Sequence, residues 1–111
     1  MLTILEIYDI PLDKRQLFCD LIADLIETDT DYDVRNYAVI ASRNFINESN
    51  RLESIVSKVA LDPQEDIVVK HNACAAILNI RNTKAKKEVL EKLLQDEELG
   101  KYAKGDLASI M

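Results

Sequence analysis

Three aspartates at alternate positions, in the stretch "DTDYDVRNYA" (29–38), have the residue type and spacing of a calcium-binding loop. They are Asp29, Asp31 and Asp33. An EF-hand loop also needs a glycine at its sixth position and a bidentate glutamate at its twelfth. Here these positions hold Val34 and Ile40, so the turn residue and the strongest ligand are both missing. We expect no specific metal site, and weak nonselective cation binding stays open.

The residue types of nucleophilic and acid–base catalysis are few. His71 is the sole histidine and falls at the start of an expected helix, on the side opposite its apolar residues. Cys19 and Cys74 lie in apolar helical patterns without metal-ligand spacing, so we expect buried free thiols. The only glycines, Gly100 and Gly105, cannot form a phosphate-cradling loop. We therefore expect no enzyme activity and no cofactor.

Composition and charge point to one all-α domain. The chain has 111 residues with only two Gly and two Pro, and Leu, Ile, Ala, Glu and Lys are abundant. Its net charge of −6 disfavours direct binding to nucleic acid or to an anionic membrane. No apolar run approaches the roughly 20 residues that cross a bilayer, and no signal peptide is visible. We expect a cytoplasmic protein.

The lysine-rich stretch "TKAKKEVLEKLL" (83–94) also speaks against nucleic acid. Glu88 and Glu91 alternate with the lysines at helical spacing, which predicts ion pairs on the helix surface. No aromatic residue is interleaved for stacking on bases. Direct nucleic-acid binding is therefore not expected from this stretch.

The chain repeats itself at an offset of 35 residues. "DYDVRNYAVIASRNFIN" (31–47) aligns with "DIVVKHNACAAILNIRN" (66–82). The identical pairs are Asp31/Asp66, Val34/Val69, Ala38/Ala73, Ala41/Ala76, Asn44/Asn79 and Asn47/Asn82. A period of 20 to 50 residues is typical of stacked supersecondary units.

Each copy has the apolar spacing of a helix, and Asp31 and Asp66 are placed to cap its first turn. The predicted core positions are Val34, Ala38, Ala41 and Phe45, then Val69, Ala73, Ala76 and Ile80. Three amphipathic helices carry Leu17, Leu21, Ile22 and Leu25; Leu52, Ile55, Val56, Val59 and Ala60; and Val89, Leu90, Leu93 and Leu94. Thr83 is the expected cap of the third of these. The stretch 97–110 is also helical, although Gly100 and Gly105 weaken it.

A helix, a short turn with aspartate, and "D-x-x-V-R/K" at the start of a second helix resemble the HEAT repeat, to which armadillo units are related. The resemblance covers about residues 13–96. It implies a short right-handed α-solenoid of about three stacked helix pairs, with units about 13–47, 50–82 and 84–110. Residues 1–10 are expected to form an N-terminal cap. The family's turn proline is present as Pro63 and is missing from 28–31.

The resemblance also implies roles for particular residues. Arg35 and Lys70 would pair with turn aspartates of an adjacent unit, and the second helices would line a concave binding surface. The expected partner-binding residues on that surface are Asn36, Arg43, Asn47, His71, Arg81 and Asn82. Arg43 is the expected anchor, because arginine is enriched at interface hot spots. The expected function is non-catalytic binding of another protein, as an adaptor, chaperone or inhibitor.

Two alternatives stay open. Residues 20–33 contain six acids and no base, which would suit an acidic inhibitor that mimics nucleic acid. So few repeats also leave apolar ends uncovered, which would suit a self-assembling module or homodimer. The apolar tail residues Leu107, Ile110 and Met111 are the expected contacts of such an assembly.

Overall fold

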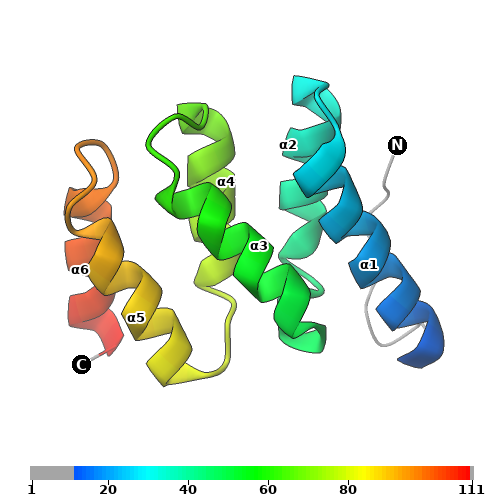
Figure 1. The fold of residues 1–111 in the computed structure, drawn as a ribbon. Helices are drawn as coiled ribbons and strands as arrows, with labels where there is room; N and C mark the ends of the chain where they lie inside the picture. The colour runs from blue at the N-terminus through cyan, green and yellow to red at the C-terminus, as the bar shows by residue number, and fades with distance from the viewer. Residues whose placement is uncertain (1–11, 111) are drawn as a thin grey trace.

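The computed structural model describes residues 12–110, and within them the chain is all-α, as predicted (Figure 1). The helices are α1 (Leu12–Thr28), α2 (Tyr32–Ser42), the short 3-10 helix η2 (Ile46–Glu48), α3 (Asn50–Leu61), α4 (Ile67–Ile77), α5 (Thr83–Leu93) and α6 (Gly100–Ile110). No β-strand occurs in this part of the chain. The cap predicted for residues 1–10 lies outside the described residues.

The helices pack in two layers. Helix α1 packs on α2, α3 on α4 and α5 on α6, while α1 also contacts α3 and α2 contacts α4. Figure 1 shows α1, α3 and α5 side by side in one layer and α2, α4 and α6 in the other. The extents are 36 × 31 × 19 Å, and the shortest equals about two helix diameters of roughly 10 Å. Successive helices run in opposite directions, so the turns gather along two opposite edges (Figure 1).

Polar caps define where the helices start. The Asp31 carboxylate accepts a hydrogen bond from the Val34 amide at 3.1 Å, and Asp66 caps α4 in the same way, as predicted. The prediction for Thr83 is wrong, because Thr83 is the first residue of α5 and Asn82 is its cap. Asn82 has the extended backbone that a cap needs, and its side-chain oxygen accepts from the Ala85 amide at 3.2 Å.

The core follows the repeat in α2 and α4 but not in α1. Of the predicted repeat positions, all are buried except Val34 and Ala41, which are half-buried. In α1 the prediction is wrong for Leu17 and Leu21, which are 64% and 47% exposed. The buried residues of this helix are Ile22, as predicted, together with Cys19, Ala23 and Ile26, and the predicted Leu25 is half-buried. Helix α1 carries two adjacent apolar stripes, and α2 and α3 cover only one of them.

The expectation of an uncovered apolar tail is also wrong for the residues that the structure describes. Leu107 belongs to the core, and Ile110 is half-buried against it. Both lie on α6, which packs along α5. The packing of α6 on α5 therefore accounts for the apolar side chains of α6.

Candidate functional site

One edge of the two-layered structure is acidic. It is formed by the turns α1–α2, α3–α4 and α5–α6, which lie along the same side of the molecule (Figure 1). We call the carboxylates of these turns and of the first turn of α2 the acidic edge: Asp29, Asp31, Asp33, Asp62, Glu65, Asp66, Asp96, Glu97 and Glu98. Several of them already bind groups of their own chain.

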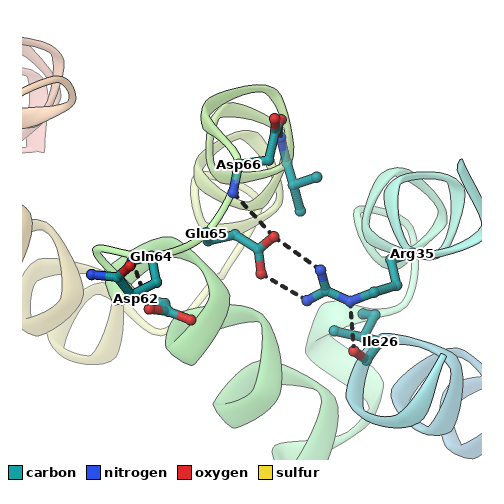
Figure 2. A network of polar contacts seen from close by, with 7 residues as sticks. Ile26, Arg35, Asp62, Gln64, Glu65 and Asp66 are labelled. Atoms are coloured by element: carbon teal, nitrogen blue, oxygen red, sulfur yellow. Dashed lines mark hydrogen bonds and ion pairs between the residues drawn. The ribbon is translucent and has the colours of Figure 1, made fainter. Parts of the chain in front are cut away.

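The strongest of these contacts join neighbouring helix pairs. Arg35 on α2 forms a two-pronged ion pair with Glu65, at 2.9 and 2.7 Å, and its Nε donates to the Ile26 carbonyl at 3.1 Å (Figure 2). Lys70 on α4 forms an ion pair with Asp96. The Lys70 partner is a turn aspartate of the next pair, as the resemblance implies, whereas the Arg35 partner is a glutamate. These two cations therefore hold the structure together.

The same contacts shift the acidity of the two carboxyl groups. The hydrogen bonds from Arg35 hold the pKa of Glu65 below its usual value. The hydrogen bond from Lys70 likewise lowers the pKa of Asp96. Both carboxylates stay charged at neutral pH and remain attached to their cations.

Two hollows beside these ion pairs do not offer a metal site. The first has a volume of about 190 Å³ and is lined by Arg35, Glu65 and Ile55, among others. The second has about 360 Å³ and is lined by Lys70 and Asp96, among others. Within residues 12–110, no group of three or more His, Cys, Asp or Glu side chains is placed to hold a metal ion. In each hollow the ion pair of the chain itself already neutralises a carboxylate.

The opposite edge is joined by two asparagines. The Asn47 amide nitrogen donates to the Asn79 carbonyl at 2.8 Å, and its side-chain oxygen accepts from the Arg81 amide at 2.8 Å. The Asn79 side chain donates to the Arg43 carbonyl at 3.0 Å. We call Asn47 and Asn79 the asparagine network. It fixes the segment that follows α2 against the segment that follows α4.

This edge is basic. The exposed side chains of Arg43, Arg81 and Lys84 and the half-buried Lys86 and Lys87 project from these segments and from the first turn of α5. We call these five residues the basic edge. Among the described residues, none of them lies within 4 Å of a carboxylate.

The predicted ion pairs of these lysines with Glu88 and Glu91 are therefore absent from the described structure. The order of the residues is unfavourable for two of these lysines. Lys84 and Lys87 each stand four residues before a glutamate, which is the weaker of the two orientations along a helix, and Lys86 has Leu90 at that spacing.

The remaining predicted binding residues lie on the layer of α2, α4 and α6. The Asn36 side chain accepts a hydrogen bond from Asn72 at 2.7 Å, which links α2 to α4. His71 meets Tyr102 of α6 edge to face, with ring centroids 5.4 Å apart. The structure thus gathers Arg43, Asn47, Arg81 and Asn82 at one edge and places Asn36 and His71 on the helix faces.

The two cysteines are free, as predicted, but only Cys19 is fully buried, whereas Cys74 is half-buried. Burial raises the pKa of both thiols to about 11. A thiol with this pKa is protonated at neutral pH, and the thiolate is the reactive form.

Four residues of these networks were missed by the prediction: Glu65, Asn72, Asn79 and Asp96. Asn79 is identical to Asn44 in the repeat alignment, and this identity could have identified Asn79 as a structural residue. Glu65 and Asp96 lie in turns between helices, but their partners Arg35 and Lys70 lie 30 and 26 residues away along the chain. No sequence pattern indicates which of several turn acids meets the cation.

Comparisons with protein-family models, with curated proteins and with solved structures find no match for this chain. Within residues 12–110, no helix is long and apolar enough to span a membrane. The class that the geometry defines is an all-α protein of two packed helix layers with one acidic and one basic edge.

Proposed function

We propose that this chain is a HEAT-like α-solenoid of about three units, 13–47, 50–82 and 84–110, that binds a partner protein without catalysing a reaction. The binding surface would be lined by α2, α4 and α6. Two ion pairs support the solenoid, since Arg35 and Lys70 are equivalent positions of the repeat and each binds an acid in the turn of the next helix pair. A series of equivalent junctions is the mark of a stacked repeat structure.

The observation that carries the binding proposal is the chemistry exposed on the layer of second helices. Tyr37, Leu78 and Tyr102 are large apolar or aromatic side chains with about half of their area in solvent, and Arg43 lies at the end of α2. Tyrosine and arginine are enriched at protein interfaces and at their hot spots. The Asn36–Asn72 hydrogen bond holds α2 and α4 in place, which lowers the entropic cost of binding.

Nucleic-acid mimicry has less support. Arg51 contacts three acids of the 20–33 stretch, Asp20 at 3.5 Å, Asp24 at 2.6 Å and Glu27 at 2.9 Å. Of the other acids, Asp31 caps α2. A mimic needs a continuous row of free charges, and this row is interrupted by a cation and a cap.

The test is affinity capture from the native cell, read by mass spectrometry. The surface variant is Tyr37→Ser/Leu78→Ser, and the matched control is Leu17→Ser/Leu21→Ser, which removes two exposed apolar side chains from the other layer. Circular dichroism first checks that both variants are folded. We expect a partner that wild type and control retain and that the surface variant loses. A partner retained by all three proteins, or lost only by the control, would contradict the proposal.

A further inference from the structure

We propose that the basic edge, Arg43, Arg81, Lys84, Lys86 and Lys87, binds a carboxylate-rich segment of the partner protein. This inference rests on the proposed function and names the chemistry of the partner. It places an electrostatic contact at one end of the surface formed by the second helices.

The distribution of charge supports it. Although the net charge is −6, the basic edge holds five cations without a carboxylate partner among the described residues. Arg35, Arg51 and Lys70 are, in contrast, held by acids of their own chain. The carboxylates of the turns gather on the opposite edge. A local cluster of unpaired cations attracts an anionic segment and orients its approach.

The basic edge is also fixed in place. The Asn79 side chain binds the Arg43 carbonyl, and the Asn47 side chain binds the Arg81 amide, so the backbone at both arginines is held by one network. Asn82 caps α5 and thereby orients the helix turn that carries the lysines. Because the backbone is already ordered, binding has only side chains left to order. Arginine suits this ligand, since its planar guanidinium binds a carboxylate with two hydrogen bonds.

The surroundings favour a protein segment over a nucleic acid. The aromatic residue in the segments that carry these five cations, Phe45, is buried, so bases have no exposed stacking partner there. Glu48 lies in η2 on one side, and Glu88 and Glu91 continue α5 on the other, which would repel a long phosphate backbone. The exposed Leu78 immediately precedes Asn79 and offers an apolar contact to a peptide.

A second copy of the chain is the less suitable occupant. The carboxylates that it would offer are those of its acidic edge. Glu65 and Asp96 are already bound to Arg35 and Lys70, and Asp66 caps α4. The acids of this edge whose side chains have no ion pair or hydrogen bond in the described structure are Asp33, Glu97 and Glu98, and they lie at the first and the last of the three turns, whereas a separate acidic segment brings contiguous unpaired carboxylates.

The experiment measures fluorescence anisotropy of a fluorescein-labelled peptide, (Glu-Asp-Leu)4, titrated with the full chain. The peptide control is (Gln-Asn-Leu)4. The test variant is Arg43→Gln/Arg81→Gln, which leaves the backbone groups bound by the asparagines unchanged. The matched variant Lys58→Gln/Lys92→Gln removes the same charge from exposed lysines of α3 and α5 outside the basic edge.

We expect the acidic peptide to bind wild type and the amide peptide not to bind. The test variant should bind about fivefold more weakly, and the matched variant within about twofold of wild type. The affinity should fall as salt rises from about 0.05 to 0.3 M, because salt screens exposed charges.

Several outcomes would overturn the inference. They are no binding of the acidic peptide, equal weakening by both variants, or tighter binding of a single-stranded oligonucleotide of equal charge. Salt-sensitive dimerisation of wild type that the test variant abolishes would instead make a second copy the occupant.

If the capture experiment finds its partner while the acidic peptide fails to bind, only this inference fails. If the peptide binds and Tyr37→Ser/Leu78→Ser leaves capture unchanged, the proposed helix surface fails instead.

Discussion

Lys70 and Asp96 form an ion pair between α4 and the α5–α6 turn, although Lys70 is only 5% exposed. The same Asp96 carboxylate accepts hydrogen bonds from the amides of Glu98 and Leu99, at 2.9 and 3.0 Å, in the turn that leads into α6. One side chain thus joins two helix pairs and shapes the turn of the later pair.

Replacing Asp96 with asparagine should destabilise the fold by about 2 kcal/mol. Asparagine can still accept the two amide hydrogen bonds, so the change isolates the charge that compensates the buried Lys70. The free energy of unfolding in urea measures this effect. The control is Glu98→Gln, an exposed neighbour whose removal should change stability by less than about 0.5 kcal/mol. Equal changes in the free energy of unfolding for the two variants would show that the ion pair contributes nothing to stability.

Stability should fall on acidification below about pH 4.5. Arg35 and Lys70 hold the pKa values of Glu65 and Asp96 below their ordinary values of 4.5 and 3.8. The unfolded chain therefore binds more protons in this range, so the contribution of both groups is complete above pH 4.5 and is lost as the pH falls further. Urea unfolding at pH 7, 5 and 3 tests this. The Glu65→Gln variant should lose less stability between pH 5 and 3 than wild type. An identical loss would show that Glu65 does not contribute to the pH dependence.

The asparagine network should contribute to stability and to local order. Asn47→Ala removes the hydrogen bonds to the Asn79 carbonyl and the Arg81 amide, and we expect a cost of about 1 kcal/mol because water can replace part of what is lost. Asn44→Ala is the control, since Asn44 is exposed and lies on the same segment. Amide hydrogen exchange gives a second readout. Exchange at Arg81 should become faster in Asn47→Ala only, and unchanged exchange there would contradict the network.

The two glycines should respond in opposite directions to alanine. A Cβ atom at Gly100 would lie 2.8 Å from the Leu94 carbonyl oxygen, so Gly100→Ala forces the backbone apart and should cost about 1 kcal/mol or more. A Cβ at Gly105 meets nothing within 4 Å, and alanine there should stabilise α6 by about 0.5 to 1 kcal/mol. Thermal unfolding of both variants measures the difference. Destabilisation by Gly105→Ala would contradict this account of α6.

The sequence predicts α2 and α4 well because their signals are local. The caps Asp31 and Asp66 and the apolar spacing after them involve residues a few positions apart, and the repeat shows them twice. Helix α1 is less predictable. Leu17 and Leu21 fit an apolar stripe as well as Ile22 and Ile26 do, and only the position of the neighbouring helices decides which stripe is buried.

The candidate site is predicted only in part, for the same reason. The alignment identifies Asn47 and Asn79 as repeat positions, but their hydrogen bonds cross 32 to 36 residues of chain. The exposure of Arg43 follows from helix geometry at the end of α2, whereas Arg81 is exposed in the link between α4 and α5. Their position along one edge, beside the lysines of α5, depends on how the helix pairs stack.

The position of Glu65 and Asp96 ties each of these turns to a helix of the preceding pair. The α3–α4 turn completes its contacts only when Arg35 of α2 is in place, and the α5–α6 turn only when Lys70 of α4 is in place. Loosening one helix pair would therefore also loosen the turn of the pair that follows it. Gly100 stands four residues after Asp96, where Arg35 and Lys70 follow Asp31 and Asp66, so α6 has no cation at the position that forms this junction in α2 and α4.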